Sequence, residues 1–165
     1  MYQKKYWREM DQLKVHTLYL EGYLEKTVQT DMAINMFLAI ASSASIAGWV
    51  VWQPLSFLWG GIIALSQAIN AIKPYLPYAK RLKSLQAASG ELESVFISME
   101  GLWFKVSEGH LTAEEVHGLQ IKYKERIRQI SQKHFGSSIL PEDKKILHKA
   151  QDTASIYFNN FYPTD

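Results

Sequence analysis

The sequence predicts an all-α integral membrane protein, with a two-helix transmembrane hairpin and a cytoplasmic helical bundle. The first observation is a charge-free run, since no charged residue lies between Asp31 and Lys73. One spanning helix needs about 20 apolar residues, and this run is about twice that length. The second is its interruption at residues 52–54, where Pro54 cannot continue a helix. The third is helical spacing of apolar residues elsewhere, without an alternating strand pattern of useful length.

Residues 1–31 are predicted to form one long N-terminal cytoplasmic helix. Apolar residues recur there near helical spacing, with charges between them. Only Gly22 weakens the pattern, and no proline separates this segment from the charge-free run, so the helix is expected to continue into the membrane. The first residues lead into a charged helical pattern, which does not fit a cleavable signal peptide.

Residues 32–73 are predicted to form the transmembrane hairpin, with helices over about 32–51 and 55–72. Lysine and arginine flank both ends of the run, and the turn carries no charge. The positive-inside rule therefore places both termini in the cytoplasm. The alternative is a buried hairpin in a soluble all-α protein. That protein would need its amphipathic helices to cover both apolar helices on all sides.

Small and polar residues inside the run form a candidate packing or pore-lining set. A small-residue ridge at four-residue spacing lets helix backbones approach, either within the hairpin or in an oligomer. The polar residues either form hydrogen bonds between helices or line a water-filled path. Such a path would require several copies, because two helices cannot enclose a pore. The set consists of Asn35, Ser43, Gly60, Ala64, Ser66, Gln67 and Asn70.

Residues 74–165 are predicted to form a helical cytoplasmic region. Its first helix runs over about 78–107 and is broken by Gly109 and His110. Thr112 and Glu115 have the spacing of a capping box, so the next helix is expected to start there and reach about residue 134. The segment 141–143 is predicted as the first turn of a last helix that ends near residue 161.

The search for catalytic chemistry gives no candidate. The sequence contains no glycine-rich phosphate loop, nucleophile elbow or zinc-protease motif. Zero cysteine excludes a disulfide framework and a zinc–thiolate site. The five histidines are scattered. We therefore expect no enzyme, catalytic residue, metal or cofactor, and no nucleic-acid partner.

One cationic cluster is denser than its surroundings and is a candidate anion or nucleotide site: Lys122, Lys124, Arg126 and Arg128. On a helix, residues 122 and 126 share one face, and residues 124 and 128 share another. The alternative is a solvated face opposite the apolar stripe. Arginine suits phosphate because its planar fork forms bidentate hydrogen bonds.

The order of segments resembles a known group of bacterial proteins. A cytoplasmic helix with Tyr6, Trp7 and Arg8, two close membrane helices and a charged helical tail are similar to SLATT-type and related two-transmembrane effector domains. These domains are encoded beside nucleotide-second-messenger synthases in antiphage systems. The resemblance implies an effector that oligomerises and disrupts the inner membrane, under the control of a cyclic nucleotide or a regulatory protein.

Two functions follow as hypotheses from the sequence. The first is this pore-forming or membrane-disrupting defence effector, with the lipid bilayer and further copies of the chain as partners. The second is a membrane anchor or assembly module that recruits a cytoplasmic partner through its helices.

Overall fold

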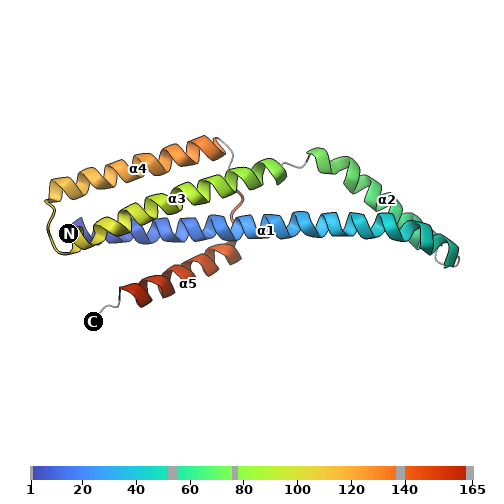
Figure 1. Cartoon of the computed structure of the whole chain (residues 1–165), viewed down its shortest axis with the longest axis horizontal. Helices are drawn as coiled ribbons and strands as arrows, with labels where there is room; N and C mark the ends of the chain where they lie inside the picture. Colours follow the sequence, from blue (N-terminus) through green and yellow to red (C-terminus); the bar gives the residue numbers. More distant parts are fainter. Residues whose placement is uncertain (1, 52–55, 76–77, 137–139, 163–165) are drawn as a thin grey trace. The chain divides into compact units, whose positions relative to one another are not determined.

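The computed structural model describes the backbone of residues 2–51, 56–75, 78–136 and 140–162 (Figure 1). Side chains are described over the same ranges except 43–51, 56 and 78–80. Over these ranges every regular element is a helix, which confirms the all-α prediction. The elements are α1 (Tyr2–Val51), α2 (Ser56–Ile72), the 3₁₀ turn η2 (Lys73–Tyr75), α3 (Tyr78–Ser107), α4 (Ala113–Phe135) and α5 (Lys144–Phe161).

The chain divides into two compact units. The first unit consists of Met1–Leu24 and Lys83–Asp165, and the second of Glu25–Leu82. Helix α1 contributes to both units as one continuous helix, as the absence of a break after residue 31 predicted. The predicted boundaries at residues 31 and 73 therefore differ from the division that the contacts give.

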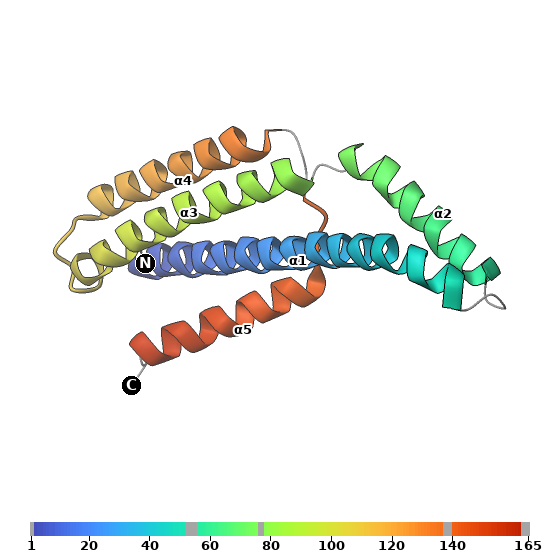
Figure 2. The ribbon, with the colours of Figure 1, turned by 45° about the vertical axis from the view of Figure 1, so that its right-hand side comes forward.

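The first unit has a core built mainly from α1 and α3. Tyr6, Met10 and Leu20 of α1 are fully buried, as are Leu92 and Phe96 of α3. Burial of each large apolar side chain contributes roughly 1.5–3 kcal/mol, so this apolar seam stabilises the unit. Figures 1 and 2 both show α3 running beside α4, and the hydroxyl of Tyr123 donates to the Ser98 carbonyl at 3.1 Å.

An aromatic cluster joins α5 to the same core. The ring centroid of Trp7 lies 4.8 Å from that of Trp103 and 4.9 Å from that of Phe158. The hydroxyls of Tyr157 and Tyr162 donate to the same oxygen of Glu100, at 2.6 and 3.1 Å. Aromatic packing and hydrogen bonds to a charged acceptor thus hold α5 in place.

The helix starts follow local sequence signals. The Glu115 amide donates to Thr112 Oγ1 at 3.2 Å, and the Thr112 amide donates to Glu115 Oε2 at 2.8 Å, which confirms the capping box. Asp143 is the N-cap of α5 and accepts from the amides of Lys145 and Ile146. Residues 141–143 therefore precede α5 and do not form its first turn.

The membrane part of the fold prediction is wrong. Within the ranges that the structure describes, no helix combines the length and the apolarity that crossing a membrane requires. Helix α2 has 17 residues and rises about 25 Å, against a hydrocarbon core of about 30 Å. Ser66, Gln67 and Asn70 also make its last turns polar. The predicted turn at residues 52–54 lies outside the described residues.

Candidate functional site

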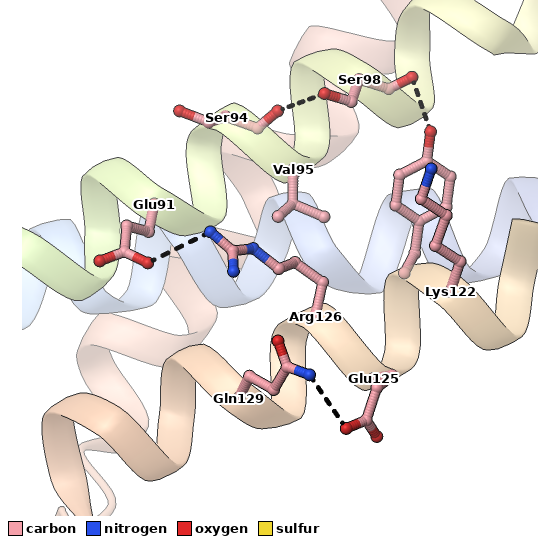
Figure 3. A pocket seen from close by; sticks show the side chains of 9 residues that line it. Glu91, Ser94, Val95, Ser98, Lys122, Glu125, Arg126 and Gln129 are labelled. Carbon is pink, nitrogen blue, oxygen red and sulfur yellow. Dashed lines mark hydrogen bonds and ion pairs between the residues drawn. The ribbon is translucent and has the colours of Figure 1, made fainter.

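The structure divides the predicted cationic cluster between different surfaces. Lys122 and Arg126 line one groove between α3 and α4 (Figure 3). Lys124 lies elsewhere, with its Nζ 2.9 Å from Glu9 Oε1. Arg128 donates from Nε and Nη2 to the two oxygens of Glu125, at 3.0 and 2.8 Å. Only the pair of cations one turn apart on α4 therefore faces a common cavity.

This groove, which we call the α3/α4 groove, has a volume of about 620 Å³, within the range of ligand-binding clefts. Its lining combines buried apolar residues with exposed polar ones. Val95 and Tyr123 are buried, whereas the small side chains of Ser94 and Ser98 are exposed. The lining residues are Glu91, Ser94, Val95, Ser98, Lys122, Tyr123, Glu125, Arg126 and Gln129.

Glu91 is the acceptor that joins α3 to the end of α4. Lys133 donates to its Oε1, and His134 Nε2 lies 2.8 Å from the same oxygen. Arg126 Nη2 is farther away, 3.8 Å from Glu91 Oε2. The hydrogen bonds from Lys133 and His134 lower the pKa of Glu91 to about 2, because they stabilise its charged form.

Glu125, on the opposite wall, is held in the same way. Hydrogen bonds from Arg128, and one of 3.2 Å from Gln129, lower the pKa of its carboxyl to about 2. Both carboxylates of the groove are therefore ionised at neutral pH and already bound by donors of the chain. Neither carboxyl has the raised pKa that a general acid near pH 7 needs.

The second unit holds the other predicted residues. The Asn35 amide donates to Asp31 at 3.0 Å and accepts from Lys73. Ser66 is buried and donates to the Ile63 carbonyl of its own helix at 2.8 Å. Gln67 and Asn70 are exposed. The side chain of Ser43 lies outside the described residues.

Among the described residues, the small-residue ridge of α2 lies open at two positions. Gly60 and Ala64 are both exposed, and a Cβ added at Gly60 would meet no atom within 4 Å among the described residues. The sequence left open whether this ridge packs within the hairpin or between copies. Its exposure favours contacts between copies.

The second unit also exposes large apolar side chains, and we call them the apolar surface. Phe57 of α2 is 95% exposed, and three residues of α1 at four-residue spacing are more than half exposed. The members are Met32, Met36 and Ile40 of α1 and Phe57, Leu58, Leu65 and Ile72 of α2. Large exposed apolar area on a protein is typical of an interaction site.

Sequence reasoning did not identify the α3 side of the α3/α4 groove. Gly90, Ser94 and Ser98 follow one another at four-residue spacing on α3, and all three are exposed. That spacing of small residues could have indicated an open helix face. Glu91 and Glu93 have different partners, since Glu91 accepts from Lys133 and Glu93 accepts from Lys14 at 3.2 Å.

Within the described residues, no group of three histidine, cysteine or carboxylate side chains could hold a metal ion. Comparison of the chain with protein-family models, curated proteins and solved structures gives no match. The two surfaces described above are therefore the basis for a functional assignment.

Proposed function

We propose that the protein is a non-enzymatic helical assembly module whose second unit associates with the second unit of other copies. The observation that carries the proposal is the apolar surface of the second unit, whose seven members are all more than half exposed. Exposed apolar area is removed from water when two such surfaces meet, at a gain of roughly 25 cal/mol per Å².

Charge and shape favour a second copy as the occupant. The run from Met32 to Ile72 carries no charged residue, so a charged partner would leave its ions unpaired and desolvated there. Another copy brings an equally uncharged surface. The exposed Gly60 and Ala64 let a neighbouring helix approach closely, while the exposed Phe57 and Leu65 of the same helix supply apolar bulk.

A finer proposal follows from the resemblance to defence effectors. Self-association would then be the output of the protein in a bacterial antiviral system, and a cyclic nucleotide or a regulatory protein would be its trigger. The proposed role does not include crossing a membrane, because no described helix has the length and apolarity for it.

Sedimentation velocity of the full chain over a range of concentrations tests the assembly proposal. We expect a mass above that of the monomer, rising with concentration. Leu65→Glu should return the protein to a monomer, because each interface would then bury a carboxylate. Ile121→Glu is the matched control, since Ile121 and Leu65 are each 54% exposed but Ile121 lies on α4 of the first unit. It should leave the mass unchanged.

Two results would overturn the proposal. One is a wild-type protein that stays monomeric at every concentration, including the case in which the monomer instead co-floats with lipid vesicles. The other is an equal loss of assembly in Leu65→Glu and Ile121→Glu, which would place the contact outside the second unit. Circular dichroism of each variant confirms that the helices are intact.

A further inference from the structure

In the α3/α4 groove each carboxylate accepts hydrogen bonds from the chain, whereas Lys122 has no such partner among the described residues. Glu125 is bound through both oxygens by Arg128, and Glu91 is bound by Lys133 and His134. Lys122 has no ion-pair partner among the described residues, and the one contact of Arg126 is the 3.8 Å approach to Glu91. The formal charges of the lining cancel, and a ligand would meet one unpaired cation, Lys122, beside Arg126, whose ion pair with Glu91 is long.

The shape of the groove suits an elongated partner. The α3 wall is formed by small side chains at Ser94 and Ser98, whose hydroxyls donate to carbonyls of their own helix at 3.0 and 2.8 Å. A Cβ added at the neighbouring Gly90 would meet no described atom within 4 Å. Small residues along one ridge allow a helix to pack closely, and the buried Val95 and Tyr123 offer apolar contact beneath it.

The geometry points to an acidic helix of a partner protein as the ligand of this groove, held by Lys122 and Arg126. The two cations lie one turn apart on α4, with about 5–6 Å between Cβ atoms at this spacing. Glutamates four residues apart on a partner helix have the same separation, so each can meet one cation. Figure 3 shows both cations extending from α4 into the space beside α3. A compact phosphate would contact only one of these two cations.

This inference concerns the first unit and does not depend on self-association of the second. The probe is a fluorescein-labelled helical peptide of about 18 residues, long enough to be partly helical, with glutamate pairs at i and i+4 beside a leucine stripe. A second peptide carries glutamine in place of every glutamate. Fluorescence anisotropy with the full chain should show saturable binding of the glutamate peptide, at least tenfold tighter than that of the glutamine peptide.

Two double variants locate the site on α4. The variant Lys122→Gln with Arg126→Gln should weaken binding of the glutamate peptide at least tenfold. Lys145→Gln with Lys149→Gln is the matched control, because it removes the same charge at the same spacing from exposed positions of α5, outside the groove. It should change binding less than twofold. Ser98→Trp, which fills the groove without changing charge, should also abolish binding, and thermal denaturation confirms that each variant is folded.

Several outcomes would overturn the inference. Absence of binding by the glutamate peptide would do so directly. Equal weakening by the two double variants would show non-specific attraction to positive charge. Equal binding of the glutamine peptide would remove the role of the cations. A last case is that inorganic pyrophosphate displaces the glutamate peptide from the wild type while Ser98→Trp still binds that peptide. This pair of results would identify a phosphate ligand and not a helix.

Discussion

At the residue scale, Gln120 is a polar side chain that is buried in the first unit without a hydrogen-bond partner among the described residues. It is 1% exposed on the inner face of α4, and neither its Nε2 nor its Oε1 has a hydrogen-bond partner among the described residues. A buried polar group without a partner costs about 1–3 kcal/mol. We therefore expect Gln120→Met, which keeps the length of the side chain, to raise the free energy of unfolding by about 1 kcal/mol.

Urea denaturation followed by circular dichroism measures this change. Gln12→Met is the control, because Gln12 is exposed on α1, and surface changes of this kind stay within about 0.5 kcal/mol. A lower stability of Gln120→Met than of wild type would contradict the prediction and indicate an internal water bound to the amide.

The candidate site shows what single residues reveal from sequence. Helical periodicity separates Lys122 and Arg126 from Lys124 and Arg128, and the structure follows that separation. Their partners could not be predicted, because Glu9 and Glu91 come from other helices far away in the sequence. Which cation is free is therefore decided by tertiary packing and not by local pattern.

At the scale of the element, the start of α4 depends on one capping box. Thr112→Ala removes the hydroxyl that accepts from the Glu115 amide and should lower the free energy of unfolding by about 1 kcal/mol. Thr153→Ala is the control, because Thr153 lies inside α5, where alanine is the better helix former. Thermal denaturation should show opposite signs for the two variants, and an unchanged Thr112→Ala would contradict the prediction.

The close approach of α1 and α5 depends on Gly22. Alanine inside a helix normally stabilises it by about 0.5–1 kcal/mol relative to glycine. Here the added Cβ would lie 2.7 Å from Ile146 Cγ2, closer than such atoms can stand. Gly22→Ala should therefore lower the melting temperature, because α5 must move away or Ile146 must distort.

Placing Gly22→Ala in an Ile146→Ala variant tests the cause of the lower melting temperature. Ile146→Ala removes the Cγ2 atom and leaves room for the new Cβ. In this background Gly22→Ala should raise the melting temperature instead of lowering it. The same sign in both backgrounds would show that the contact with Ile146 is not responsible.

The predictions for the elements differ in quality for a physical reason. The capping box and the continuous helix through residue 31 were predicted, because both depend on neighbours within a few residues. The transmembrane hairpin was predicted wrongly from the length of an uncharged run. Length without charge does not equal apolarity, since Ser66, Gln67 and Asn70 fall within one segment of α2. Gly22 was noted only as a weak point, because its neighbour Ile146 is distant in sequence.

At the scale of the whole molecule, the two units differ in their charge, because the run from Met32 to Ile72 in the second unit has no charged residue. The first unit buries its aromatic cluster and satisfies Glu91 and Glu125 with donors of its own. The second unit leaves its apolar surface exposed. In a function by assembly, the second unit makes the contact and the first unit is a stable body. Because the ion pairs lie in the first unit, pH should change the stability of that unit and not the self-association of the second.

Ion pairs of the first unit predict how its stability depends on pH. The pKa values of Glu91 and Glu125 are about 2, below the ordinary value of 4.5, because Lys133, His134, Arg128 and Gln129 hold the charged forms. A lowered pKa contributes stability that is fully present above about pH 4.5 and is lost as the pH falls through about 2. We therefore expect the melting temperature to fall steadily between pH 5 and pH 2.

Glu91→Gln with Glu125→Gln isolates this contribution. The double variant should melt lower than wild type at pH 7, and its melting temperature should change less between pH 5 and pH 2, because the groups that titrate there are gone. Glu108→Gln is the control, since Glu108 is exposed and has no ion pair among the described residues, and it should keep the wild-type slope. An identical slope in wild type and double variant would contradict the prediction. The fall in melting temperature between pH 5 and pH 2 would then have to come from other carboxylates. Glu91 would join α3 to α4 without stabilising the contact.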